Sequence, residues 1–275
     1  MRVSHHSAGE SFLQRAESFL LQAEAENNLI LGIAGSWRDY SSDLTDRPYL
    51  AAVEQEHAIV ACALRTPPRN VMVTRAKDDA LEALASDLRK VYGELPGVLA
   101  PNATAKTFSQ IWARHVGAAV QPGVRQRIYQ LDRVSPVNTC PGGFRPATQE
   151  DLDVAVKWAH AFTDETGAVM DERKAHQAIA AGSLFLWEDK EPVSMAMWQG
   201  RTPNGVRVSF VFTPMDRRNR GYASACVAAL SQHLLDQGHQ FCFLFTDLAN
   251  PTSNHIYQRI GYHPVCDVSD YLFAA

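Results

Sequence analysis

Apolar positions along the chain switch repeatedly between a helical and a strand period. Over residues 11–27 they recur every three or four positions, which predicts a helix with Phe12, Ala16 and Phe19 on one face. Helices are also expected over residues 78–92, 104–116, 171–181, 222–237 and 254–260, and from Thr148 onward, where Asp151 completes a capping-box pattern. Strands are expected over residues 49–53, 58–64, 71–74, 124–131, 184–188, 193–200, 206–213, 241–246 and 264–273. This alternation indicates an α/β or α+β fold.

A polar segment rich in proline and glycine, Ser135 to Gly143, predicts a domain boundary. We therefore expect two domains, residues 1–133 and 134–275, as the length of 275 residues also suggests. The two halves repeat one plan, because the segments from Tyr49 and from Phe185 both read as strand, acidic turn, strand and a closing Arg-Thr-Pro. We interpret this repeat as a duplication, with a coincidence of two α/β patterns as the alternative.

Composition excludes several classes of protein. The net charge of −4 and a pI near 6.2 provide no basic surface for nucleic acid. No apolar run is long enough to span a membrane, and the first residues lack the hydrophobic segment of a secretion signal. The five cysteines are an odd number without a Cys-x-x-Cys pair, so we expect reduced thiols, no metal site and a cytoplasmic location.

The strongest local pattern is a strand that runs into an arginine-rich loop and then a helix, from Val211 to Ala223. Gly221 lets the backbone approach a ligand closely, since no Cβ intervenes. The first N–H groups of the new helix have no internal partner, and the helix dipole adds positive potential. Together with Arg217, Arg218 and Arg220, this loop predicts a phosphate site.

This loop resembles the signature of the GCN5-related N-acetyltransferases, the GNAT family, which is Gln/Arg-x-x-Gly-x-Gly/Ala. Residues 218–223 read Arg-Asn-Arg-Gly-Tyr-Ala and match it completely. A second family pattern follows, with Asn250, Ser253, Tyr257 and the Gly-Tyr pair at 261–262 in the expected places. The resemblance covers most of residues 143 to 273 in the family's order of elements.

The resemblance implies two GNAT-like domains, each a mixed, mostly antiparallel sheet flanked by helices. It also implies that strand 206–213 splays from strand 240–246, and that acetyl-CoA lies in the opening as co-substrate, without a metal. Tyr257 would point at its sulfur. The residues implied to bind acetyl-CoA are Val211, Phe212, Thr213, Arg218, Asn219, Arg220, Gly221, Tyr222, Ala223, Ser224, Asn250 and Asn254.

Acetyl transfer from a thioester to an amine needs a proton acceptor, a polarised carbonyl and an acid for the thiolate. A tyrosine hydroxyl is a usable acid, and we assign that role to Tyr257, with a buried core aromatic as the alternative. We expect Glu165 to be the base, with Asp247 next and Glu188 third. Each of these carboxylates also fits a plain surface position.

The first half departs from the family pattern. The segment after Thr74 has no glycine and places Asp78 and Asp79 where a phosphate would lie. Ser109 stands at the position that matches Tyr257. We therefore expect residues 1–133 to be a degenerate GNAT-like domain that does not bind CoA.

The sequence predicts an N-acyltransferase that moves an acetyl group from acetyl-CoA to an amine. A non-catalytic acyl-CoA sensor on the same fold is the alternative, and a structural partner protein is a third reading. The acceptor stays open between a small amine, an amino acid, an antibiotic and a protein, and a homodimer is also open. No nucleic-acid or membrane partner is expected.

Overall fold

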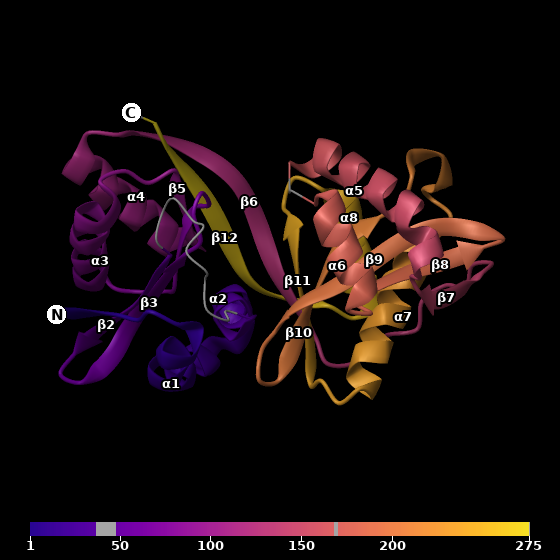
Figure 1. Ribbon diagram of the computed structural model, residues 1–275, viewed down its shortest axis with the longest axis horizontal. Helices are drawn as coiled ribbons and strands as arrows, with labels where there is room; N and C mark the ends of the chain where they lie inside the picture. Colours follow the sequence, from indigo (N-terminus) through magenta and orange to yellow (C-terminus); the bar gives the residue numbers. More distant parts are fainter. Residues whose placement is uncertain (37–47, 168–169, 275) are drawn as a thin grey trace.

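The computed structural model describes residues 1–36, 48–167 and 170–274. Within them, twelve strands form one continuous sheet in the order β1-β2-β3-β4-β5-β12-β6-β11-β10-β9-β8-β7 (Figure 1). The strands are β1 (Arg2–His5), β2 (Tyr49–Gln55), β3 (Ala58–Arg65), β4 (Val71–Val73), β5 (Gly97–Pro101), β6 (Ala119–Leu131), β7 (Gly143–Pro146), β8 (Leu184–Asp189), β9 (Glu191–Arg201), β10 (Gly205–Phe212), β11 (Phe241–Asp247) and β12 (His263–Ala274). The helices are α1 (Gly9–Leu20), α2 (Glu24–Ser36), α3 (Asp78–Tyr92), α4 (Asn102–Val116), α5 (Leu152–Thr166), α6 (Glu172–Ala180), α7 (Tyr222–Asp236) and α8 (Pro251–Ile260).

The strand order repeats from each edge inward. From one edge it reads β1 to β5 and then β12, and from the other β7 to β11 and then β6. Each half of the sheet therefore ends on a strand from the other half of the sequence. β12 pairs antiparallel with β5, β6 pairs antiparallel with β11, and the two central strands pair with each other from His263↔Gln130 to Ala274↔Ala119.

The sequence predicted two domains, each with its own sheet, and the exchange of β6 and β12 joins the two sheets into one. The expected mixed, mostly antiparallel arrangement is confirmed, but the two halves share one sheet across β12 and β6, which cross between them in Figure 1. The division of the sequence at residues 133 and 134 stays a prediction. In the folded molecule, each half depends on a strand whose residues lie on the far side of that division.

Four apolar clusters cover the two faces of this sheet. In the first half, α3 and α4 pack on one face and α1 and α2 on the other. In the second half, α7 and α8 cover one face, and α5 and α6 the other. Helix α2 also reaches the second half, where a Cβ added at Gly32 would lie 2.8 Å from Cα of Gly200. The same layer plan occurs twice, as a duplication predicts.

Most predicted elements are present, and the differences have physical causes. The short strands β1, β5 and β7 were not expected, because four or five residues display too little of an alternation. The helix predicted over residues 11–27 is two helices in the structure: α1 ends at Leu20, and α2 extends to Ser36. The full length of α2 was missed because its apolar residues surround the helix and do not form one stripe. The predicted capping box is confirmed: Thr148 and Asp151 cap the 3-10 turn that leads into α5. Within the described residues, no helix is long and apolar enough to cross a membrane.

Candidate active site

The predicted splay between two parallel strands is present. β10 and β11 pair only over their first three residues, from Gly205↔Phe241 to Arg207↔Phe243, and then part. Beyond that point β11 pairs with β6 alone. β10 also bulges, because Ser209↔Met197 is followed by Phe212↔Met195, which leaves one extra residue on β10. Phe210 in this bulge has a φ of 50°, a value rare for a side chain with a Cβ.

Backbone groups at the bulge are partly engaged. The Ser194 hydroxyl donates to the carbonyl of Phe212 at 3.1 Å and lies 2.8 Å from the hydroxyl of Thr213. The register of β10 against β9 skips Phe210 and Val211. Of the three residues expected along the pantetheine arm, Phe212 is paired in the strand ladder, whereas Val211 and Thr213 lie outside it.

The loop after β10 forms the cradle that its sequence predicts. Asn219 and Gly221 both have positive φ, 62° and 86°, so the backbone between them curls into a concave turn of the kind that binds anions. Gly221 is the N-cap of α7, and no side chain caps that helix. The N–H groups of Tyr222, Ala223 and Ser224 begin the helix and are available to a phosphate. A Cβ added at Gly221 would meet only Cys140, at 3.6 Å.

The arginines of this loop are held by neighbours. Arg218 donates through Nη2 to both oxygens of Glu165 at 2.7 Å, and through Nε to the carbonyl of Thr213 at 2.9 Å. Arg217 pairs with Glu191, and Arg220 reaches the carbonyl of Asp216 at 3.3 Å. The Tyr222 hydroxyl donates to Asp189 at 2.6 Å, and the backbone N–H of Tyr222 lies in the uncapped first turn of α7.

The three carboxylates expected as possible bases lie in different settings. Glu165, at the end of α5, is tied to Arg218, and Glu188 on β8 accepts from Arg145 at 2.5 Å. Asp247 ends β11 and is exposed. In the part of the chain that the structure describes, its carboxylate accepts only the N–H of Ala249, at 2.8 Å. Of the three, Asp247 alone is free of a cation within the described residues. The same residues contain no cluster of three side chains suited to a metal ion.

Tyr257 lies beneath the parted strands, on α8. It is 9% exposed and belongs to the core cluster of α7, α8, β10 and β11. Its ring centroid lies 6.5 Å from that of Tyr129 and 6.0 Å from that of Tyr262. Burial raises the pKa of Tyr257 to about 12. Within the described residues its hydroxyl has no hydrogen-bond partner, so the donor is free for a ligand.

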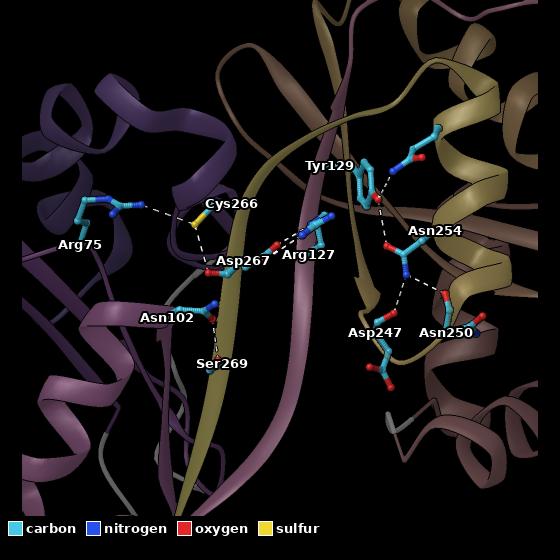
Figure 2. A network of polar contacts seen from close by, with 11 residues as sticks. Arg75, Asn102, Arg127, Tyr129, Asp247, Asn250, Asn254, Cys266, Asp267 and Ser269 are labelled. Carbon is cyan, nitrogen blue, oxygen red and sulfur yellow. Dashed lines mark hydrogen bonds and ion pairs between the residues drawn. The ribbon is translucent and has the colours of Figure 1, made fainter.

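The two asparagines expected to touch the cofactor also hold α8 in place (Figure 2). Asn250 is the N-cap of α8 and accepts from the N–H of Ser253 at 3.0 Å. Asn254 donates to the carbonyls of Asp247 and Asn250, at 2.8 and 2.7 Å. It also accepts from the hydroxyl of Tyr129 on β6, at 3.0 Å. Sequence reasoning missed Tyr129, because it reads as one more apolar position of a strand from the first half.

The corresponding loop of the first half differs in structure as well as in sequence. Only residues 74–77 separate β4 from α3, against 213–221 between β10 and α7. Asp79 accepts the N–H of Ala80 at 2.9 Å, and Arg75 is drawn away to Glu26 at 2.7 Å. Ser109 is buried and donates to the carbonyl of Lys106 within its own helix. These contacts support the expectation that this half does not bind CoA, which stays a prediction.

Comparisons with known proteins agree with this geometry. Residues 186–270 match the family described as FR47-like protein. A GNAT-family acetyltransferase from Colwellia psychrerythraea superposes with a TM-score of 0.63 at 12% identity, over 100% of both chains. A GCN5-related N-acetyltransferase from Kribbella flavida gives 0.63 at 16% identity, over 92% of this chain and 95% of that one.

A tandem GNAT protein from the clavulanic acid biosynthesis pathway is also similar. Its TM-score is 0.58 at 11% identity, over 99% of this chain and 98% of that one. A sequence search among curated proteins gives no match. At these identities the likeness concerns the fold, and it extends over the whole chain. The chain therefore has a GNAT fold, and its second half carries the FR47-like segment.

Proposed function

We propose that the second half of this chain is an N-acetyltransferase, which moves an acetyl group from acetyl-CoA to an amine. The observation that carries the proposal is the uncapped N-terminus of α7 behind the positive-φ turn at Asn219 and Gly221, set at the end of two parting strands. A pyrophosphate would accept from the N–H groups of Tyr222, Ala223 and Ser224. The pantetheine arm would then follow Val211 to Thr213.

Binding of acetyl-CoA would require one rearrangement. Arg218 is engaged with Glu165 in this structure, and a phosphate would compete with that carboxylate for the same guanidinium. Both side chains are about 40% exposed (38% and 41%), so their ion pair is screened and weak. The incoming phosphate can therefore displace Glu165 from Arg218 at a small cost in free energy.

The chemistry assigns one step to each group. The amine nitrogen attacks the thioester carbonyl carbon and forms the C–N bond, while backbone N–H groups at the β10 bulge hold the oxyanion. A proton leaves the nitrogen for Asp247 through water. The C–S bond then breaks, and the Tyr257 hydroxyl donates its proton to the thiolate sulfur. We favour Asp247 over Glu165 as the base, because Glu165 lies against Arg218 of the phosphate loop, whereas Asp247 ends β11, one of the two parted strands.

A thiol-release screen tests this function. The full chain is incubated with acetyl-CoA and a panel of amines, and free CoA is followed together with the acetylated product by mass spectrometry. The expected result is amine-dependent release with at least one acceptor, reduced in an Asp247→Asn variant. Tight binding of acetyl-CoA without turnover on any amine would favour the sensor reading instead.

A further inference from the structure

A buried arginine without a carboxylate partner lies on the face of β10 opposite α7. Arg207 is 8% exposed and makes one hydrogen bond, from Nη1 to Oδ1 of Asn28 at 3.1 Å. Within the described residues, no acid lies within ion-pair distance of its guanidinium. An uncompensated charge in the interior is unfavourable, and burial lowers the pKa of Arg207 to about 10. A bound anion would compensate the charge of Arg207.

Two further cations lie near it. The ammonium of Lys174 on α6 lies 4.3 Å from the centroid of the Phe210 ring, at the bulge. Burial, together with the charges of Arg69 and Arg207, lowers the pKa of Lys174 to about 8. Arg69 is exposed and comes from the β3–β4 loop of the first half. The three cations therefore form one cluster that spans both halves of the chain.

Within the described residues, no acidic side chain forms an ion pair with Lys174, Arg207 or Arg69. Asp171 is the acid that acts on Lys174, and its carboxylate caps α6 by accepting the N–H of Lys174 at 2.8 Å. Ser209, two residues after Arg207 on the same face, adds a second unsatisfied group. Its hydroxyl is buried and has no hydrogen-bond partner within the described residues. A hydroxyl donor beside two cations suits an anionic acceptor of hydrogen bonds.

The cluster lies apart from the phosphate loop. The loop opens at the start of α7, whereas Lys174, Arg207 and Phe210 lie on the face covered by α5, α6 and α2. An acceptor amine must reach the thioester from a side that the pantetheine arm does not occupy, and this face provides it. At about 3.3 Å per residue, Arg207 lies roughly 10 Å along β10 from the bulge.

We propose that Lys174, Arg207, Ser209 and Arg69 bind an anionic group of the acceptor, several bonds away from the amine that is acetylated. The acceptor is then a small amine that also carries a carboxylate or phosphate, and both halves of the chain contribute to its site. This inference rests on the proposed function, because it identifies the substrate class of the proposed acetyltransferase.

Calorimetric titration of the full chain, saturated with CoA, tests this site without turnover. The probes are glutarate, for a carboxylate, and inorganic phosphate. We expect at least one to bind the wild type, and Lys174→Met to weaken that binding about tenfold or more. Met keeps the apolar stem over Phe210, so the fold is retained. Arg69→Met should weaken binding less, because Arg69 is exposed.

The matched control is Arg173→Met, which removes an exposed charge from the neighbouring position of α6 and should leave binding unchanged. Binding of neither probe, or equal binding by the wild type and Lys174→Met, overturns the inference. Neither result depends on acetyl transfer, so it leaves the proposed function standing. Conversely, failure of the amine screen does not remove an anion site that the titration detects.

Discussion

Tyr257 combines two properties that a general acid at a dry site needs. Its ring is held by packing against Tyr129 and Tyr262, while its hydroxyl has no partner within the described residues. A tyrosine already carries its proton at neutral pH, and burial raises the pKa of Tyr257 from its ordinary value to about 12. Tyr262 belongs to the same core cluster as Tyr257, but its hydroxyl is hydrogen-bonded to Ser231 at 2.8 Å and is not free for a ligand.

We predict that Tyr257→Phe lowers kcat by about 10- to 100-fold while the dissociation constant of acetyl-CoA changes little. The substitution removes only the hydroxyl and keeps the packing of the ring. The control is Tyr262→Phe, which should cost about 1 kcal/mol of stability through the lost Ser231 bond and leave kcat close to wild type. If Tyr257→Phe turns over within twofold of wild type with chemistry rate-limiting, Tyr257 is a packing residue.

At the scale of elements, the start of α5 shows a cap that the sequence could predict and a partner that it could not. Thr148 and Asp151 form the expected capping box. The structure adds Arg145 from β7, which donates to both oxygens of Asp151 at 2.7 and 2.8 Å. This guanidinium, together with the bonds from Thr148, lowers the pKa of Asp151. The ion pair between Arg145 and Asp151 therefore holds β7 against the start of α5.

We predict that Asp151→Asn lowers the free energy of unfolding at pH 7 by about 1–3 kcal/mol. A depressed folded-state pKa means that Asp151 contributes stability above its unfolded pKa of about 3.9, and that this contribution is lost as pH falls through the folded value. Urea unfolding at pH 7 and at pH 3 should therefore show a smaller difference between the proteins at pH 3.

Asp153→Asn is the matched control, because Asp153 is an exposed acid in the first turn of the same helix. It should change stability by only a few tenths of a kcal/mol at either pH. An equal loss in both variants would show that the helix dipole, rather than the contact with Arg145, explains the effect.

The phosphate loop was predictable because it depends on local sequence, and the splay was expected from the resemblance to the GNAT family. A glycine at 221, arginines around it and a helix after it specify one backbone course. The setting of Glu165 was not predictable, since its contact with Arg218 joins residues 53 positions apart. The cluster of Lys174, Arg207 and Arg69 was missed for the same reason: each reads as an ordinary charge until the fold brings the two halves together.

At the scale of the molecule, the exchange of β6 and β12 is the feature that the sequence did not reveal. Both strands have ordinary patterns, and nothing local specifies which half each one completes. The pairing is reinforced by Arg127 of β6, which donates to both oxygens of Asp267 on β12 at 2.6 and 2.9 Å (Figure 2). Each half therefore contributes to the stability of the other.

We predict that deletion of residues 263–275 removes hydrogen-exchange protection from β5 and α4 in the first half, as well as from β6. β12 pairs with β5 and packs on α4 through Phe273 and Trp112, so its loss exposes both. Deletion of residues 1–5 is the control, because it removes the edge strand β1, which pairs only with β2. Unchanged protection of β5 in the first variant would mean that the halves fold independently.

The number of acetyl-CoA sites on the full chain tests the central claim most directly. Calorimetric titration should give one site in the wild type. Gly221→Asp should weaken it more than tenfold, because a carboxylate and a strained φ of 86° replace the open turn. Gly238→Asp, at a φ of 95° beyond the other end of α7, is the control and should bind as wild type. Two sites, or equal affinity in Gly221→Asp and Gly238→Asp, would contradict the assignment of acetyl-CoA to the second half alone.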